Sequence, residues 1–366
     1  MTRIAVAGAT GHVGAAVVDV LRTSGHDAVE IARSAGVDVI TGDGLDDALT
    51  GVSTVIDVLN TAETDADAAT AFFTGTTGTL LAAEERAGVR HHVLLSIVNV
   101  DAVPDNGHYL GKVAQEERVR SGTVPWTILR ATQFHSFAAM VAGWTTANGV
   151  ATVAPLLVQP VAVADVAQEL VRLALGDPQR RAAELAGPDT HDLVDLARRT
   201  LAARGESTAV RASWQDNPFG TSMAGEVLLP GSDAQTGPTT FEDWLSAEPG
   251  PRTLAETYYQ AWTAHDFDRL RDVLADDATF RGPLGTADSG DDCLAGLRGM
   301  SQMMTGLDIV RMVVDGPDVI TWYDLLTADA PPTATVNWMH VEHGGIAEIR
   351  VAFDPRPILD ASQSKG

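Results

Sequence analysis

Three glycines near the N-terminus constrain this chain most strongly. Gly8, Gly11 and Gly14 follow the first apolar run of the sequence, residues 4–7, and open its first amphipathic segment. Glycines at this spacing let the backbone turn tightly from a strand into a helix and let main-chain amides approach a pyrophosphate at the helix N-terminus. An incidental turn could contain the same three glycines. Their position after a strand and before an apolar helix nevertheless favours dinucleotide binding.

Length and composition narrow the class of protein. A chain of 366 residues suggests two domains. Its net charge of -24 argues against nucleic acid or an anionic membrane surface as a partner. The single cysteine, Cys293, cannot form an intramolecular disulfide, and no signal peptide precedes the first strand, so we expect a cytoplasmic protein. Residues 136–164 carry no charge but are interrupted by polar residues and prolines, which predicts a buried, irregular pocket wall and no membrane-spanning helix.

Strands and helices alternate through the first half of the chain. Short apolar runs at 28–32, 55–59, 93–95 and 127–129 are separated by segments with helical character, such as 67–87 and 112–120. This pattern predicts an α/β fold, a doubly wound parallel Rossmann sheet whose ligands bind at the carboxyl ends of the strands. A helix-rich section over 163–204 follows, and we expect the first domain to span 1–245 and a linker to span 246–253.

The pattern changes after the linker. Leu254, Tyr258 and Trp262 fall on one helical stripe, a short helix follows over 267–274, and extended runs then dominate. Those runs are 309–314, 319–326, 333–342 and 346–353, with a hairpin turn at 344–345. We expect a smaller α+β cone over 254–359 and a tail over 360–366.

The residues after the second apolar run bear on the choice of nucleotide. Arg33 stands where the ribose end of a bound dinucleotide would lie, and a guanidinium there suits the 2'-phosphate of NADP. Glu30, two residues before the end of that run, keeps NAD open as an alternative. We therefore expect NADP as the cofactor, with NAD possible.

Several segments of the first half resemble one family, the atypical short-chain dehydrogenase/reductases of the NmrA-like and NAD(P)H-binding quinone reductase type. The resemblance rests on the 8–14 turn, Arg33 and the segments 96–104, 108–116 and 129–134, and extends through Trp244. It implies that Arg33 contacts the adenosine phosphate. It also implies two further sets: Thr10, Gly11, His12 and Val13 at the pyrophosphate, and Ser96, Lys112 and Gln133 toward the nicotinamide.

The residue at the usual proton-donor position differs from that of ordinary short-chain dehydrogenases. Ordinary short-chain dehydrogenases place a tyrosine four residues before the lysine, whereas His108 occupies that position here and Tyr109 lies only three residues before Lys112. His108 could donate a proton near neutral pH, or it could be a solvated loop histidine. A quinone can accept hydride with protonation from solvent, so a reductase of this type does not require the tyrosine.

The second half resembles the SnoaL-like polyketide cyclase branch of the nuclear transport factor 2-like superfamily, on the segments 258–262, 265–266, 280–283 and 353–357. The resemblance implies a deep pocket and an aspartate acid/base near the strand ends, for which Asp354 is the candidate, with a pKa raised by an apolar environment. Asp354 could equally be a turn residue before Pro355. His340 is a second candidate for the pocket lining. Aromatic side chains suited to a flat ring are Tyr258, Trp262, Trp322 and Tyr323.

The leading hypothesis is an NADPH-dependent reductase of a quinone, enone or aromatic polyketide-like ketone, with the cone binding or further transforming the same hydrophobic, ring-containing substrate. Two alternatives stay open: an NADP-binding regulator without turnover, and cyclase, isomerase or hydratase chemistry in the cone beside a structural nucleotide. The histidines lack the spacing and third ligand of a catalytic zinc site, so no metal site is expected. A homodimer is a further possibility.

Overall fold

The computed structural model describes residues 2–342 and 344–363, and the chain divides into two compact units. The first unit comprises Met1–Thr145, Thr152–Ala197 and Val210–Ser246. The second comprises Thr146–Ala151, Arg198–Ala209 and Ala247–Gly366. Two short segments that precede the expected linker therefore group with the second unit. The expected linker itself holds the end of α8 (Phe241–Ala247) and the start of α9 (Pro251–Ala264).

A seven-stranded parallel sheet forms the centre of the first unit, as the alternation of strands and helices predicts. Strand β1 has β2 on one side and β3 on the other, so the direction of winding reverses beside the glycine turn, where dinucleotides bind in folds of this kind. In spatial order the strands are β11 (Gln235–Thr236), β8 (Ala182–Ala186), β5 (Trp126–Ala131), β4 (His91–Ile97), β3 (Thr54–Asp57), β1 (Arg3–Ala7) and β2 (Asp27–Ile31).

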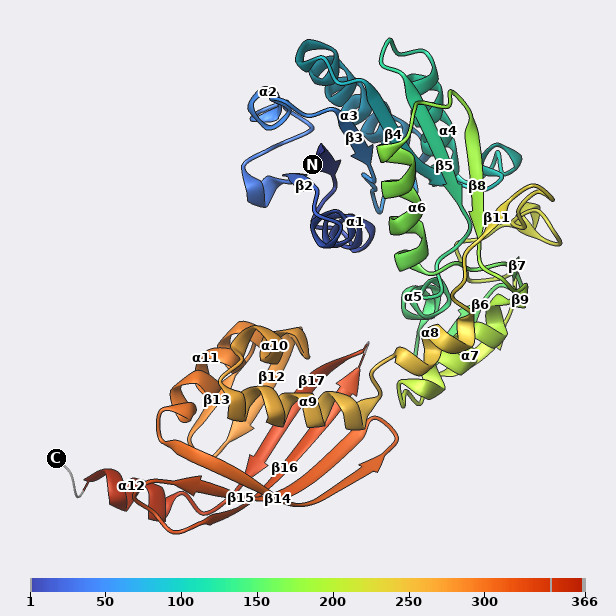
Figure 1. Ribbon diagram of the computed structural model, residues 1–366. Coiled ribbons are helices and arrows are strands. Elements are labelled where there is room, and N and C mark those ends of the chain that lie inside the picture. The colour runs from blue at the N-terminus through green and yellow to red at the C-terminus, as the bar shows by residue number, and fades with distance from the viewer. Residues whose placement is uncertain (1, 343, 364–366) are drawn as a thin grey trace. The chain divides into compact units, whose positions relative to one another are not determined.

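Helices cover both faces of this sheet. Helices α1 (His12–Thr23) and α6 (Val163–Leu175) pack together on one face, and α3 (Ala66–Ala87) and α4 (Gly107–Arg120) pack together on the other (Figure 1). Local signals fix their ends: the Asp65 side chain accepts from Ala68 N–H at the start of α3, and Asn106 does the same for Tyr109 N–H at the start of α4. Other elements along this part of the chain are α2 (Leu45–Ala48), α7 (Leu193–Ala203) and the 3-10 turns η1 (Arg33–Ala35), η2 (Val100–Ala102) and η3 (Thr221–Met223).

The uncharged stretch 136–164 differs from its expected irregular form. It contains α5 (Phe137–Thr145), β6 (Val150–Val153) and β7 (Leu157–Val158); β6 pairs with β10 (Ala209–Ala212) and β7 with β9 (His191–Asp192). Although Leu156 and Val161 are buried, Met140 and Trp144 of α5 are exposed to solvent. The expected burial is confirmed for most of residues 151–162, but the expected irregular form was wrong, because polar residues and prolines within the stretch separate short regular elements.

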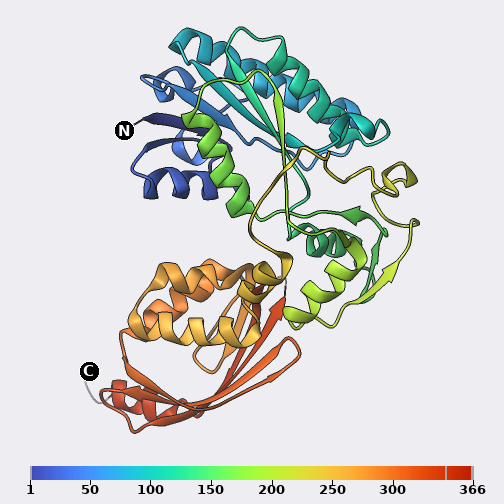
Figure 2. The same cartoon turned by 45° about the vertical axis from the view of Figure 1, so that its right-hand side comes forward.

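The second unit is a curved six-stranded sheet with three helices on one face, in agreement with the expected α+β cone (Figures 1 and 2). Its strands, in spatial order, are β13 (Gly285–Ala287), β12 (Leu274–Gly282), β17 (Gly345–Ala352), β16 (Thr333–Glu342), β15 (Asp318–Thr327) and β14 (Met304–Asp315). All neighbouring pairs are antiparallel except β12 with β17, which is parallel. The pairing of Glu342 with Gly345 agrees with the expected hairpin.

The three covering helices are α9, α10 (Phe267–Asp272) and α11 (Gly290–Ser301). Pro251 begins α9 and His265, with a φ of 58°, ends it. The inner sheet residues Val319, Met339 and Ile349 pack with these helices in one apolar core. A last helix, α12 (Arg356–Gln363), crosses the start of the expected tail, and residues 364–366 lie outside the described part of the chain.

Candidate functional site

The glycine turn has the geometry of a dinucleotide-binding bend. Gly8 has a φ of 84°, which side-chain-bearing residues rarely adopt, and a Cβ there would lie 3.2 Å from the Val58 carbonyl oxygen. A Cβ at Gly14 would lie 2.0 Å from the Gly8 carbonyl oxygen, so no larger residue fits. Gly11 is the N-cap of helix α1 and provides no side-chain cap, and the first turn of the helix has no acidic residue. Its first amides and positive dipole end therefore suit a pyrophosphate.

The two residues that bear on the 2'-phosphate have different surroundings. The carboxylate of Glu30 accepts a hydrogen bond of 2.6 Å from Arg22 of α1. Arg33 lies just beyond the carboxyl end of β2, at the start of η1, and is exposed. Because Glu30 is already paired, a free ribose hydroxyl would have to compete with Arg22 for it, whereas the guanidinium of Arg33 faces solvent.

The residues expected toward the nicotinamide follow β4 and β5, at the same edge of the sheet. Ser96 is next to the last residue of β4, and Gln133 lies two residues beyond β5; both are buried. Ser96 lies near Glu116 of α4. Burial alone would raise the pKa of Glu116, but hydrogen bonds of 2.9 and 2.8 Å from Arg130, with help from Ser96, lower it.

Lys112 is enclosed in the structure. Its ammonium group donates to the Leu95 carbonyl oxygen at 2.7 Å and to Gln115 Oε1 at 2.6 Å, and it lies 4.9 Å from the centre of the Phe73 ring. Only 4% of the residue is exposed. Burial lowers the pKa of Lys112 to about 8, even though Asp57 and Glu116 act in the opposite direction. The amine therefore contacts the Leu95 carbonyl oxygen of β4 and the Gln115 side chain of α4.

A buried polar network, unrecognised from the sequence, surrounds this lysine. Gln115 Nε2 donates to Asp57 Oδ2 at 3.2 Å and to Thr77 at 3.0 Å, and the other Asp57 oxygen accepts from Leu59 N–H at 2.9 Å. Leu59 lies beside the glycine turn, because a Cβ at Gly8 would lie 3.4 Å from the Leu59 backbone nitrogen. Hydrogen bonds through Asp57 and Gln115 thus connect the backbone beside the glycine turn to Lys112.

A buried histidine extends the network away from the bend. His92 Nδ1 lies 2.8 Å from Glu84, and its Nε2 lies 3.9 Å from Asp57; none of the three side chains is exposed. Burial opposes a charge on His92, but Glu84 and Asp57 raise its pKa. Since these residues come from α3, β3 and β4, no local motif in the sequence signals the cluster.

Burial shifts the pKa of each candidate proton donor away from neutral. Burial raises the pKa of Tyr109 to about 12, although Gln133 near its hydroxyl acts against this. Burial, and then the charge of Lys112, lower the pKa of His108, whose ring meets that of Phe73 edge to face. His108 is therefore a packed residue and not the solvated loop histidine considered above.

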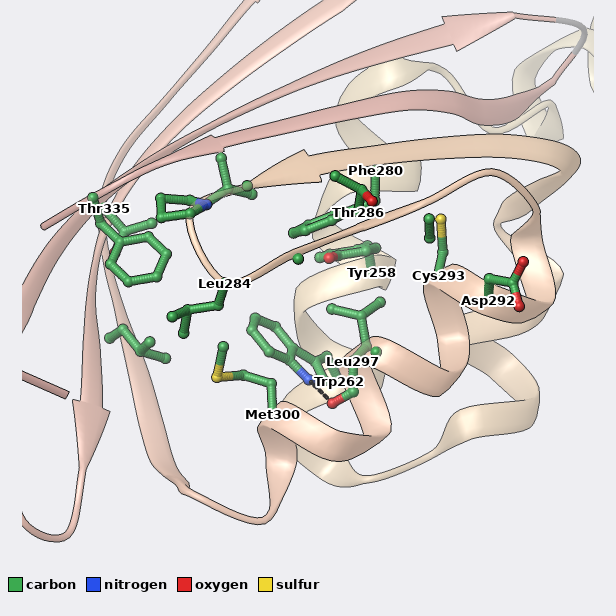
Figure 3. A pocket seen from close by; sticks show the side chains of 18 of the residues that line it. Tyr258, Trp262, Phe280, Leu284, Thr286, Asp292, Cys293, Leu297, Met300 and Thr335 are labelled. Atoms are coloured by element: carbon green, nitrogen blue, oxygen red, sulfur yellow. Dashed lines mark hydrogen bonds between the residues drawn. The ribbon is translucent and has the colours of Figure 1, made fainter. Parts of the chain in front are cut away.

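The second unit contains a cavity of about 140 Å³ between α9, α11 and the inner face of the sheet (Figure 3). Tyr258, Trp262, Leu297 and Met300 point into this space, and the Trp262 indole is fixed by a hydrogen bond of 3.0 Å to the Leu297 carbonyl oxygen. Tyr258 brings a hydroxyl to the lining. Its pKa is raised by burial, so it is a neutral hydrogen-bond donor at physiological pH.

Two further side chains of this cavity, Cys293 and Tyr323, are neutral at physiological pH. Burial raises the pKa of Cys293 to about 11, and burial also raises the pKa of Tyr323. Asp292 is exposed and accepts a hydrogen bond of 2.8 Å from Ser289 at the start of α11. The cavity is thus equipped mainly for apolar binding.

The two sequence candidates in the second unit lie outside the cavity lining. Asp354 is exposed and its carboxylate binds Arg356; this lowers its pKa to about 2, so the expected raised pKa was wrong. The strand alternation places His340 on the outer face of β16, where its Nδ1 lies 2.8 Å from Asp318 and its ring stacks on Trp338. Trp322 is on the outer face too and is 51% exposed. The positions of His340 and Trp322 depend on the register of their strands, which could not be predicted from the sequence alone.

Two further features bear on function. Among the described residues, one set has potential metal-ligand atoms within 4.8 Å of one another: Asp189, His191 and Glu242, of which Asp189 and Glu242 are exposed. In the described part of the chain, no helix combines the length and apolar character needed to cross a membrane.

Comparison with known proteins agrees with the two units. Residues 8–177 match the NAD(P)H-binding family model, and residues 255–349 match the SnoaL-like domain model. The chain thus joins an N-terminal NAD(P)H-binding domain to a C-terminal SnoaL-like domain, and the expected resemblances and fold class are confirmed.

Solved structures extend this comparison. The NADPH-dependent quinone oxidoreductase QOR2 from Escherichia coli is 17% identical with a TM-score of 0.51, covering 66% of this chain and 98% of its own. MoeE5, in complex with UDP-glucose and NAD, is 18% identical with a TM-score of 0.51, covering 67% of this chain and 96% of its own. A protein from Kribbella flavida is 26% identical with a TM-score of 0.30, covering 31% of this chain and 93% of its own. No curated protein matches the sequence.

Proposed function

We propose that the chain is an NADPH-dependent reductase whose hydride acceptor is a ring-containing quinone, enone or ketone, and that the SnoaL-like domain binds the substrate or its product. The observation that carries the proposal is the glycine bend, where a Cβ at Gly14 would strike Gly8 at 2.0 Å and α1 begins without a side-chain cap. With its pyrophosphate bound at the bend, NADPH would supply a hydride from its nicotinamide ring. A proton completes the reduction, so that NADPH and H⁺ convert a quinone to a hydroquinone and NADP⁺.

Two observations support NADPH over NADH. Arg33 is exposed beside the carboxyl end of β2, and Glu30, which would favour NADH, is held by Arg22. Arg33 would then bind the 2'-phosphate through charge-assisted hydrogen bonds.

The protein groups near the expected nicotinamide favour an acceptor that takes its proton from solvent. The Tyr109 hydroxyl has a pKa of about 12 and only 9% of the residue is exposed, and the Lys112 amine is occupied by Leu95 and Gln115. A quinone fits this arrangement better than an unactivated ketone. Hydride addition to a quinone gives a hydroquinone anion, which is a much weaker base than the alkoxide formed from a ketone, so it needs no protein acid to complete the reduction.

The cavity of the SnoaL-like domain supports binding of a single-ring ligand. Its volume of about 140 Å³ is close to that of engineered apolar cavities of about 150 Å³ that take up benzene. The Tyr258 hydroxyl could donate to one carbonyl oxygen of such a ligand. The mainly apolar lining, with Tyr258, Cys293 and Tyr323 neutral at physiological pH, favours a binding role over cyclase or isomerase chemistry.

A second candidate function is supported by the same enclosed residues. If Lys112 and Tyr109 stay buried when nucleotide binds, the domain would bind NADP without turning it over and act as a redox sensor. Oxidation of NADPH followed at its absorbance maximum, with benzoquinones, naphthoquinones, cyclic enones and aryl ketones as acceptors, separates the two functions. Turnover with any of them supports the reductase. Tight binding of both cofactor forms with no turnover across the series contradicts it and supports the sensor.

We also propose that the protein forms a homodimer through the outer face of the SnoaL-like sheet. Ile320, Trp322 and Val336 are neighbours on this face and are 44%, 51% and 41% exposed. Burial of such a patch is favourable by about 25 cal/mol per Å². Sedimentation should show a dimer, and Trp322→Glu should convert it to a monomer; a wild-type monomer at all concentrations contradicts the proposal.

A further inference from the structure

Helix α5 presents large apolar side chains to solvent directly after the carboxyl end of β5. Trp144 is 60% exposed and Met140 is 46% exposed, although both are apolar. The Phe137 ring lies 6.4 Å from that of Trp144 and 5.8 Å from that of Phe219, which comes from a distant part of the sequence. These four residues, Phe137, Met140, Trp144 and Phe219, are called the aromatic shelf below.

The shelf is tied to the edge of the sheet where the dinucleotide site lies. On one side, Phe137 N–H donates to the Phe134 carbonyl oxygen at 2.9 Å, one residue beyond Gln133. On the other, the segment that carries Phe219 is held to the loop after β4, since Ser222 donates to Asp105 at 2.6 Å.

A second contact fixes the same segment. Asn99, two residues after β4 and with a φ of 52°, donates its side-chain amide to the carbonyl oxygens of Val227 at 3.0 Å and Leu229 at 2.7 Å. The shelf therefore borders the carboxyl ends of β4 and β5, the edge at which parallel sheets of this type bind ligands.

The chemistry of the shelf specifies its ligand. Residues 136–164 contain no charged side chain in a protein of net charge -24, so the α5 part of the shelf is uncharged, whereas the Asp105 carboxylate lies beside the segment that carries Phe219. Three rings and a polarisable thioether favour a flat ring, which can stack offset or edge to face. A protein partner would need to bury about 800 Å² on each side, which is more than four side chains provide.

We propose that the aromatic shelf holds the ring of the hydride acceptor, and that Trp144 and Phe219 determine the preference of the enzyme for aromatic and quinonoid acceptors. This inference rests on the reductase function proposed above and assigns it a substrate subsite. It places the acceptor on the β4 and β5 side of the sheet, away from the Arg33 end of the nucleotide.

Binding can be tested without turnover. 1,4-Naphthoquinone, added to the full-length protein without NADPH, should quench tryptophan fluorescence with saturation, and the quenching should fall at least threefold in Trp144→Ala. Trp322→Phe removes a tryptophan of the SnoaL-like domain but keeps an aromatic side chain on the outer face of its sheet, and should leave the saturation constant unchanged. Equal quenching in wild type and Trp144→Ala overturns the proposal. So does protection of Trp144 from acrylamide in the free protein, which would mean that another part of the chain or a second copy covers the shelf.

Kinetics provide the second test. In Trp144→Ala and Phe219→Ala, KM for naphthoquinone should rise about tenfold, while kcat changes less than twofold and the NADPH dissociation constant stays the same. An unchanged KM in both variants overturns the shelf and leaves the reductase function intact. Failure of the wild type to bind NADPH, with quinone quenching of Trp144 preserved, refutes the reductase function instead.

Discussion

The enclosed position of Lys112 predicts an unusual titration that can be measured directly. The chain has two lysines, Lys112 and Lys365. With the amines labelled, NMR should show one lysine signal that titrates near 8, below the ordinary value of about 10.4, because burial lowers the pKa of Lys112 to about 8. Lys112→Met should remove this titration.

The same shift has a consequence for stability. Between pH 8 and about 10.4 the unfolded chain keeps the proton on this lysine and the folded chain has lost it, so the free energy of unfolding rises with pH. Each unit of pKa difference is worth about 1.4 kcal/mol, and the contribution of Lys112 should therefore increase by about 2.5 kcal/mol from pH 7 to pH 10.

Urea unfolding of wild type and Lys112→Met at these two pH values isolates this contribution, because other groups titrate in both proteins. The stability difference, wild type minus variant, should increase with pH. Lys112→Arg serves as the control, because its guanidinium stays charged at pH 10. Its stability relative to Lys112→Met should not increase between pH 7 and pH 10. A Lys112 signal that titrates above pH 10, or a stability difference that is flat between pH 7 and pH 10, would refute the enclosed state of Lys112.

Three other substitutions test separate parts of the site. Arg33→Ser should weaken NADPH about tenfold by calorimetry and leave NADH unchanged; equal weakening of both would contradict a role at the 2'-phosphate. Asp354→Asn should leave kcat/KM within twofold of wild type, because this exposed carboxylate binds Arg356 and lies outside the cavity lining; a loss of tenfold or more would restore it as an acid/base. Tyr258→Phe should weaken acetophenone binding in the SnoaL-like domain by about twofold to tenfold, the usual value of one neutral hydrogen bond; unchanged binding in NMR titrations would show that the hydroxyl does not contact the ligand.

The features that could be predicted from the sequence are those that depend on neighbouring residues. The glycine bend is one, since the φ of Gly8 and the close approach of Gly14 to Gly8 arise within seven positions. Helix α11 was missed for a local reason: the acidic segment 288–292 resembles a loop, yet Ser289 accepts from Asp292 N–H and begins the helix. A serine followed three residues later by an acidic residue is a capping signal that could have identified it.

The features that could not be predicted depend on residues far apart in the chain. Asp57, Glu84 and His92 occur in ordinary strand and helix segments, and only the packing of α3 against β3 and β4 brings them together. Asp354 was placed near the pocket by resemblance, and His340 by its position on one face of an expected strand. Strand pairing and the local contact with Arg356 instead put them on outer surfaces.

Calorimetric titration of the full-length protein with NADPH tests the central claim most directly. Wild type should bind one NADPH per chain. Gly14→Ala should not, since its Cβ would lie 2.0 Å from the Gly8 carbonyl oxygen. Gly75→Ala, at an exposed helical glycine with no atom within 4 Å of the added Cβ, should bind as wild type does. Absence of heat from NADPH and NADH with folded wild type, or binding by Gly14→Ala equal to that of Gly75→Ala, would contradict the account.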